Sequence, residues 1–427
     1  MILHLLCRKV KSLEVEEITA GIYTGEGASH SWTWFVEALD PMEGVKKVYL
    51  DEADVTHESL AKLDIFLMGG GDVYGMAKAL GRKGAHALEK FVDNGGIFLG
   101  SCAGAYLVMS GVNLPPYDPF NLIDAGMVNY AISPPILPGI LPKYLVPYGK
   151  GYVFYPAYGP VELEMMGEPL LSNRKKMVAP LYGGPVIDPG KGAKPLGYYG
   201  GLQKGCITLA SEPYMEENFN GGCAAAWAPK GKGKVFLFGP HLECPGFPEG
   251  NDAIRNVAGS AKGERMKLKP REGLMPTGEK EKNKGGESSC VGLKSPRNFK
   301  FNSERKKKQL QSIKRELSNA RIVAFGLEKM PVSWNVGTKV WEPEKIRLFV
   351  EFCWRRIERL EKVVAAEKEN SSEEEELEEL VESVIRTREM IRDLKKSLDK
   401  GTETTHLAMH LFRHLKRQTV MLLETSG

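Results

Sequence analysis

Short apolar runs alternate with amphipathic segments along the first 256 residues, and glycine-containing turns separate them. The apolar runs are rich in β-branched and aromatic residues, which predicts buried strands at 18–24, 46–52 and 63–71 and at the start of 96–111. Apolar positions with helical spacing predict helices at 31–39, at 85–96 and at the end of 96–111. Strands that alternate with helices favour an α/β fold. Its sheet is expected to be mostly parallel, flavodoxin-like and covered by helices on both faces.

The pattern changes after residue 111. Residues 111–160 are rich in proline and tyrosine and show little periodicity, so we interpret them as an insertion or lid beside the sheet. A strand-rich part follows, with apolar runs at 178–188, 205–212, 221–230 and 233–243. Residues 1–256 are therefore expected to form one α/β domain.

The rest of the chain divides into a linker and a helical region. Residues 257–305 have few large apolar side chains and many Lys, Gly, Ser and Pro residues, which predicts a basic, flexible linker. Helical periodicity over 306–427 predicts helices at 344–367, 373–399 and 404–423. The second helix has apolar residues at heptad spacing, as in a coiled coil, and the short connections favour an antiparallel bundle or hairpin.

Composition limits the class of protein. Of the 427 residues, 42% are hydrophobic and 26% are charged, which excludes a wholly disordered chain, a collagen-like fibre and a polytopic membrane protein. The most apolar stretch, 131–147, contains five prolines and a lysine, so it is not a membrane-spanning helix. The first residues lack the pattern of a signal peptide. We expect a cytoplasmic protein that does not bind membranes.

The seven cysteines are scattered along the chain, and no C-x-x-C pair occurs. An odd number without such pairs argues against a disulfide framework or a zinc ribbon. Each cysteine is by default a small buried apolar residue.

One cysteine occupies a special position. The segment from Gly100 to Tyr106, with Cys102 between small residues, directly follows the predicted strand 97–99. Small neighbours suit a sharp strand-to-helix turn that raises a nucleophile above the sheet edge. The start of the following helix would lower the pKa of the thiol. The alternative is a structural cysteine in a glycine-rich turn.

Two further segments provide partners for such a thiol. His241 and Glu243 follow the predicted strand 234–238, so the imidazole is expected to act as base and the carboxylate to orient it. Gly69, Gly70 and Gly71 follow another predicted strand, and their backbone N–H groups, with that of Ala103, would face a developing oxyanion. A structural histidine and an ordinary βα turn are the alternatives.

Together these segments resemble the class I glutamine amidotransferases, which have a Gly-x-Cys-x-Gly turn, an upstream glycine loop and a His-x-Glu pair. The resemblance implies that Cys102 is the nucleophile, His241 its base and Glu243 the orienting acid. Tyr106 stands at the substrate-binding position where glutaminases usually have Gln.

A closer resemblance covers residues 18–250. GGIFLGSCAGAYL, LYGGPV and GKGKVFLFGPHLE are similar to the amidotransferase-like domain at the N-terminus of some biotin–protein ligases and to its stand-alone prokaryotic forms. The chain contains no Gly-Arg-Gly-type biotinyl-adenylate loop downstream. The resemblance therefore does not imply ligase activity.

Three other features were considered as sites. Gly25 to Ser29 open a predicted helix and could hold an anionic group, but a plain βα turn is favoured. His406, His410 and His414 share a helix face without a Cys or acidic partner, so we expect no metal there. Residues 261–320 contain 17 Lys and Arg against seven Asp and Glu. A solvated linker is favoured there, with nonspecific nucleic-acid binding as the alternative.

Two functions remain from the sequence. In the first, the chain is a cysteine-dependent amidohydrolase or amidotransferase that cleaves a C–N bond in a small amide or carbonyl substrate, without a cofactor. An amidotransferase also needs an acceptor site, so the C-terminal helices would dock a protein partner. In the second, the domain is a catalytically silent scaffold whose helical tail binds a partner or nucleic acid.

Overall fold

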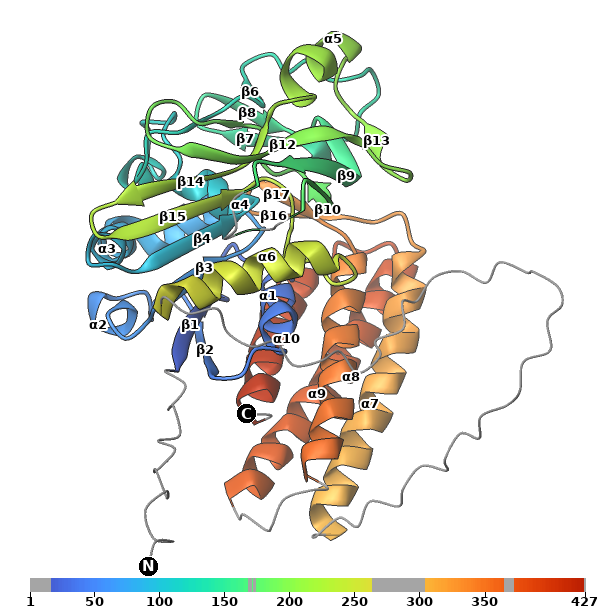
Figure 1. Cartoon of the computed structure of the whole chain (residues 1–427). Coiled ribbons are helices and arrows are strands. Elements are labelled where there is room, and N and C mark those ends of the chain that lie inside the picture. Colours follow the sequence, from blue (N-terminus) through green and yellow to red (C-terminus); the bar gives the residue numbers. More distant parts are fainter. Residues whose placement is uncertain (1–16, 168–170, 172–173, 263–303, 365–371, 426–427) are drawn as a thin grey trace, which may run out of the picture.

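Two bodies of secondary structure pack side by side in the computed structural model, which describes residues 17–167, 171, 174–262, 304–364 and 372–425 (Figure 1). The first body is an α/β domain built on one large mixed sheet. The second consists of four long helices from the C-terminal part of the chain. The predictions of an α/β fold and of a C-terminal helical region are confirmed.

The parallel half of the sheet contains the strands expected from the apolar runs. Its order is β2-β1-β3-β4-β15, and all neighbouring strands run parallel. The strands are β1 (Ile18–Tyr23), β2 (Val45–Leu50), β3 (Ile65–Met68), β4 (Ile97–Ser101) and β15 (Gly233–Phe238). Every residue of β3 and β4 is buried, as is typical of parallel strands covered on both faces. The carboxyl ends of β3, β4 and β15 meet at one edge of the sheet. The glycine loop 69–71, Cys102, and the pair His241 and Glu243 directly follow these three strands.

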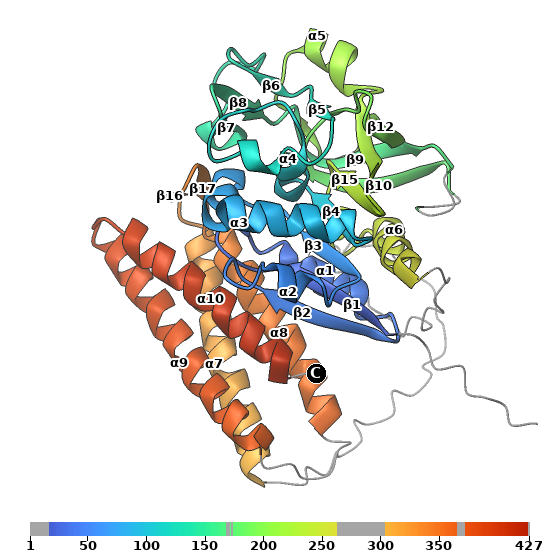
Figure 2. The same cartoon turned by 90° about the vertical axis from the view of Figure 1, so that its left-hand side faces the viewer.

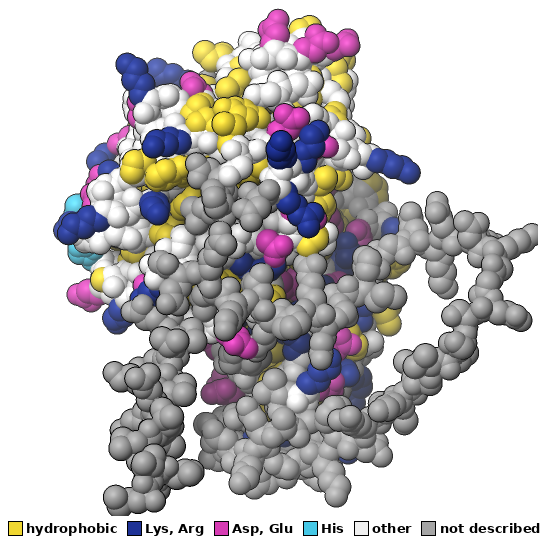
Figure 3. Space-filling model, in the orientation of Figure 1, with side chains coloured by type: hydrophobic (Ala, Val, Ile, Leu, Met, Phe, Trp, Pro, Cys, Tyr) yellow, Lys and Arg dark blue, Asp and Glu magenta, His cyan; other side chains and the backbone are white. Residues whose placement is uncertain are grey.

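Beyond β15 the sheet continues with antiparallel strands in the order β14-β12-β9-β10. These are β9 (Ala157–Met165), β10 (Lys176–Tyr182), β12 (Lys194–Leu202) and β14 (Cys223–Lys230). Short strands β5 (Gly126–Met127), β11 (Ile187–Asp188) and β13 (Ile207–Thr208) join this half. Hydrophobic side chains gather over it on the face shown in Figure 3, while basic and acidic side chains are interspersed around them.

Helices cover both faces of the parallel half (Figures 1 and 2). One face carries α1 (Trp32–Leu39) and α6 (Pro248–Gly259), followed by the turn η4 (Ser260–Lys262). The other carries α3 (Val73–Asp93) and α4 (Ala103–Val108), with the short α2 (His57–Leu60) nearby. The apolar face of α3 is fully buried against the sheet, which explains its helical spacing in the sequence.

Residues 111–160 form a compact layer at the antiparallel end of the domain (Figure 1). A small sheet in the order β6-β8-β7 is its centre. Its elements are η1 (Asp118–Phe120), β6 (Tyr130–Ala131), η2 (Pro142–Tyr144), β7 (Leu145–Tyr148) and β8 (Gly151–Phe154). Farther along the chain, α5 (Glu212–Tyr214) and η3 (Met215–Phe219) pack near it, with the rings of Phe154 and Tyr214 5.1 Å apart.

The C-terminal helices form a bundle in which α7 contacts α8 and α9, and α10 contacts the same two helices. They are α7 (Glu304–Glu328), α8 (Glu344–Val364), α9 (Ser372–Asp399) and α10 (Thr405–Thr425). Among the helices of the described ranges, none combines the length and the apolar character needed to cross a bilayer. A β-hairpin that the sequence analysis did not predict, β16 (Trp334–Val336) and β17 (Lys339–Trp341), connects α7 to α8.

The bundle docks on the α/β domain through α8. Arg356 and Arg359 both bind the carboxylate of Asp40 at the end of α1, and Arg355 Nε lies 2.9 Å from Glu37 Oε1. Asp40 is largely buried, so this cluster is better shielded from water than a surface ion pair. The helical tail is therefore packed against the domain that precedes it in the chain, and it holds the β16–β17 hairpin beside the sheet edge (Figure 2).

Candidate active site

Cys102 occupies a strained turn between β4 and α4. Its φ of 53° makes it the only non-glycine residue with positive φ among the described residues. A Cβ on Gly100 would lie 2.4 Å from the carbonyl oxygen of Gly104, and one on Gly104 would lie 2.1 Å from that of Met68. Glycines on both sides are thus required by close backbone packing. The turn places the thiol at the carboxyl edge of the parallel strands.

His241 and Glu243 follow β15, the strand next to β4. The imidazole Nδ1 lies 2.7 Å from Glu243 Oε1, and the Ser101 hydroxyl donates to the same oxygen at 2.7 Å. The ring of Trp34 meets that of His241 edge-on at 5.4 Å, which restricts the imidazole further. The carboxylate is fully buried, and the thiol and the imidazole are nearly so. The structure therefore brings Cys102, His241 and Glu243 together. It also places Ser101, which the sequence analysis did not identify, in contact with Glu243.

The electrostatics of this cluster favour a thiolate. Burial raises the pKa of the Cys102 thiol, but the adjacent His241 and, to a smaller extent, Lys339 hold it below its usual value. Burial likewise lowers the pKa of His241, but Glu243 and Cys102 raise it to about 9. Both shifts favour the state in which Cys102 is a thiolate and His241 an imidazolium.

The glycine loop after β3 lies directly beneath the imidazole. The Gly70 N–H donates to Ser31 Oγ at 2.9 Å, and the Gly104 N–H donates to the carbonyl of Gly69 at 3.0 Å. A Cβ on Gly70 would lie 2.7 Å from His241 Cε1, so only glycine fits there. Ala103 is the first residue of α4, where a helix N–H has no carbonyl partner within its own helix. The hydrogen bond from Gly70 to Ser31 Oγ shows that a backbone N–H of the glycine loop binds an oxygen atom at this position.

Tyr106 connects α4 to the layer formed by residues 111–160. Its hydroxyl accepts a hydrogen bond from Asn129 Nδ2 at 2.7 Å, and its carbonyl accepts one from the Tyr148 hydroxyl at 3.2 Å. The side chain is almost completely buried. In this arrangement Tyr106 supports the floor of the site by packing rather than by presenting a polar group to the cavity.

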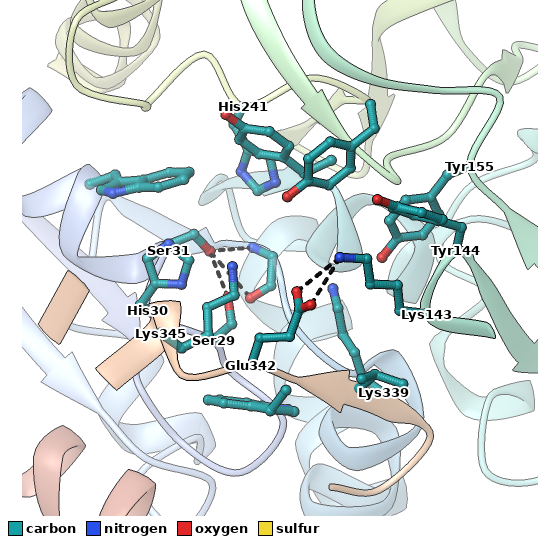
Figure 4. A pocket seen from close by; sticks show the side chains of 16 residues that line it. Ser29, His30, Ser31, Lys143, Tyr144, Tyr155, His241, Lys339, Glu342 and Lys345 are labelled. Carbon is teal, nitrogen blue, oxygen red and sulfur yellow. Dashed lines mark hydrogen bonds and ion pairs between the residues drawn. The ribbon is translucent and has the colours of Figure 1, made fainter. Parts of the chain in front are cut away.

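A cavity of about 650 Å³, its open mouth included, extends from His241 (Figure 4). Its walls come from three regions: the α/β domain, the layer of residues 111–160, and the segment of β17 and the start of α8. The polar and charged side chains on the walls are Ser29, His30, Ser31, Lys143, Lys339, Glu342 and Lys345. Of the cluster of Cys102, His241 and Glu243, His241 lines the cavity, and the C-terminal region forms another part of its wall.

The sequence analysis missed the C-terminal contribution. Thr338, in the turn of the hairpin, bonds to the Asp72 carboxylate through its N–H at 2.9 Å and its hydroxyl at 2.6 Å. Lys339 Nζ then donates to the carbonyl of Gly71 at 3.2 Å. Apolar residues on both sides of Gly337 are typical of a short hairpin. The sequence analysis instead assigned this segment to the helical region.

Other residues considered from the sequence have structural partners. The Glu26 N–H donates to Glu52 Oε2 at 2.8 Å, so a side-chain carboxylate already uses the turn after β1. His406 Nε2 and His410 Nε2 lie 3.2 Å apart, and His414 Nε2 contacts the carbonyl of Ser383 at 2.9 Å. Within the described ranges, no three His, Cys, Asp or Glu side chains are grouped as metal ligands. Most of the basic segment 261–320 lies outside the described residues.

Residues 21–117 match the model of a protein family described as "Biotin-protein ligase, N terminal". The match confirms the resemblance to the amidotransferase-like domain over β1 to α4, the part that contains Cys102. It ends before His241 and Glu243. No curated protein matches the chain.

Several solved structures are similar to this chain. A glutamine amidotransferase is 17% identical, covers 56% of this chain and 100% of its own, and gives a TM-score of 0.35. A ThuA-like protein from Parabacteroides merdae is 12% identical and covers 60% and 94% of the two chains, with a TM-score of 0.38. A β-galactosidase from Bacillus circulans is 14% identical at a TM-score of 0.32. The match covers 53% of this chain but only 26% of the β-galactosidase, about a quarter of its length.

Proposed function

We propose that the protein is a cysteine-dependent amidohydrolase or amidotransferase that cleaves a C–N bond of a small amide through a thioester. The observation that carries the proposal is the buried cluster of Cys102, His241 and Glu243 at adjacent strand ends, with the 2.7 Å contact between imidazole and carboxylate. A nucleophile, a base in contact with it and a third group that orients the base are the parts that covalent acyl transfer needs.

The chemical steps follow from these positions. The Cys102 thiolate attacks the carbonyl carbon, and the C=O electron pair moves to oxygen. The N–H groups of Ala103 and Gly70 stabilise this oxyanion, and Ser31 Oγ, which accepts from the Gly70 N–H at 2.9 Å, turns aside to admit it. The tetrahedral intermediate collapses to the thioester, and the leaving amine takes the proton of the His241 imidazolium. Neutral His241 then deprotonates water or an acceptor amine, whose attack releases Cys102.

Alkylation of Cys102 tests the nucleophile. At pH 6 an ordinary thiol is almost fully protonated, so we expect Cys102 to react with iodoacetamide about a hundredfold faster than a thiol of unshifted pKa. Cys206 is an internal reference, because burial raises the pKa of its thiol. Peptide mapping by mass spectrometry assigns each rate to its cysteine. A rate for Cys102 no higher than that of Cys206 would contradict the proposal.

Substitution of the base tests the pair. We expect His241→Ala to slow the labelling of Cys102 at pH 6 by at least about tenfold, because the thiol loses its main stabilising charge. His86→Ala, which removes an exposed histidine, is the matched control. Amide cleavage needs the imidazolium proton, so it should fall above pH 9 while alkylation does not.

A further inference from the structure

We propose that the substrate of this site carries a carboxylate, which Lys339 and Lys345 of the C-terminal region bind inside the cavity that His241 lines. The inference rests on the proposed function, since it names the class of amide that the same site selects. It makes the hairpin and the start of α8 the specificity-determining part of the site.

The positive charges of the cavity are not balanced equally by protein carboxylates. Lys143 Nζ binds both oxygens of Glu342, at 2.9 and 3.1 Å, so its charge is paired (Figure 4). Lys345 Nζ forms a longer ion pair with Glu344 Oε2, at 3.7 Å. Lys339 has neutral partners, the carbonyl of Gly71 at 3.2 Å and the hydroxyl of Tyr155. Neither ammonium group is paired as closely as that of Lys143, so both can bind an anion that enters the cavity.

The two lysines also repel each other. Burial and the charge of Lys339 hold the pKa of Lys345 below its usual value, although Glu344 and Glu342 act in the opposite direction. An anionic group placed between them would relieve both effects, because it would pair with one charge and screen the other.

His30 is a second, independent indication of a ligand. It lines the cavity, only 4% of its surface is exposed, and neither ring nitrogen has a hydrogen-bond partner. Burial and the nearby cations hold the pKa of His30 well below its usual value, so its ring is neutral, with one donor and one acceptor nitrogen. Buried polar groups are nearly always paired in folded proteins. A polar ligand group in the cavity would provide the missing partner.

The remaining walls limit the size of the ligand. Trp34, Tyr144, Tyr158, Tyr182 and Trp341 surround the charged groups. The ion pair between Lys143 and Glu342 joins the layer of residues 111–160 to the segment after β17. An opening lined by these aromatic rings suits a small amide with a carboxylate, not an extended polypeptide.

Two alkylating agents that differ in charge test the proposal. Iodoacetate carries a carboxylate and iodoacetamide is its neutral analogue, and both react with the same thiolate. The ratio of their rates at Cys102 is therefore independent of the fraction of thiolate. We expect this ratio to exceed that of the neutral thiol N-acetylcysteamine by about tenfold or more, because a cationic cavity concentrates the anion. Lys339→Met and Lys345→Met should each lower the ratio severalfold, whereas Lys329→Met, an exposed lysine of the same region, should not.

The outcomes separate this inference from the proposed function. In one outcome, both agents label Cys102 rapidly while the ratio of the iodoacetate rate to the iodoacetamide rate equals that of N-acetylcysteamine. This result overturns the carboxylate site but supports Cys102 as a nucleophile. If Cys102 is inert to both, calorimetric titration with succinate and with neutral succinamide decides instead. Binding of succinate alone that is lost in Lys339→Met supports the site, and equal or absent binding overturns it. Competition by inorganic phosphate stronger than that by succinate would assign the site to phosphate and overturn the carboxylate.

Discussion

The α/β domain and the C-terminal region contribute to one cavity in different ways. The domain supplies Cys102, His241 and Glu243 from the ends of neighbouring buried strands, where close packing requires glycines, and His241 lines the cavity. The C-terminal region supplies Lys339 and Lys345 from a short hairpin and a helix start, and the turn of the hairpin is held by Asp72. Reactive groups thus lie on the rigid element, while the groups that would select a ligand lie on a docked one.

The strongest test of this contrast is to disturb the rigid side. In Gly70→Ala the new methyl group would lie 2.7 Å from His241 Cε1 and 3.2 Å from Nε2, so the imidazole must move. We expect labelling of Cys102 by iodoacetamide at pH 6 to fall by about a hundredfold, as for other small misplacements of catalytic groups. Gly326→Ala is the control, because a Cβ there meets no atom within 4 Å. It should leave labelling unchanged and stabilise α7 by about 0.5–1 kcal/mol.

A smaller effect is expected from the docked side. Lys339 is one of the cations that lower the pKa of Cys102, so Lys339→Met should raise this pKa towards the ordinary value. Labelling by iodoacetamide should fall by up to about tenfold at pH 6 and by less at pH 9, where a larger fraction of the thiol is ionised in both proteins. Lys339→Arg keeps the charge and should keep the rate. An equal loss at both pH values would indicate a structural role only.

The smallest effect concerns the attachment of the hairpin. Thr338→Val removes the hydroxyl that donates to Asp72 at 2.6 Å but keeps the backbone N–H bond at 2.9 Å. A hydrogen bond to a charged group contributes about 1.5–3 kcal/mol, so local opening of the hairpin should become easier by about that amount. Hydrogen exchange at residues 334–341 should speed up while exchange in β4 stays the same. Faster exchange in both would show that the two regions unfold together.

The sequence predicted the parts of the site that depend on local rules. Glycines around Cys102 and at position 70 indicate close approaches of the backbone. Buried apolar runs predict the strands that bring these segments to one edge of the sheet. The part of the cavity wall that the C-terminal region forms could not be predicted from local sequence patterns. It depends on arginines of α8 meeting Asp40 and Glu37 on a helix near the opposite end of the chain. Such docking between distant elements has no periodicity, so Lys339 and Lys345 could not be assigned from the pattern.

The late position of Lys339 and Lys345 in the chain also matters during synthesis. A ribosome releases Cys102 and His241 well before the hairpin, and domains tend to fold in the order in which they emerge. A nascent or prematurely terminated chain would expose the thiol before its cationic wall exists. Synthesis of residues 334–345 would then be the event that gives the proposed nucleophile its selectivity.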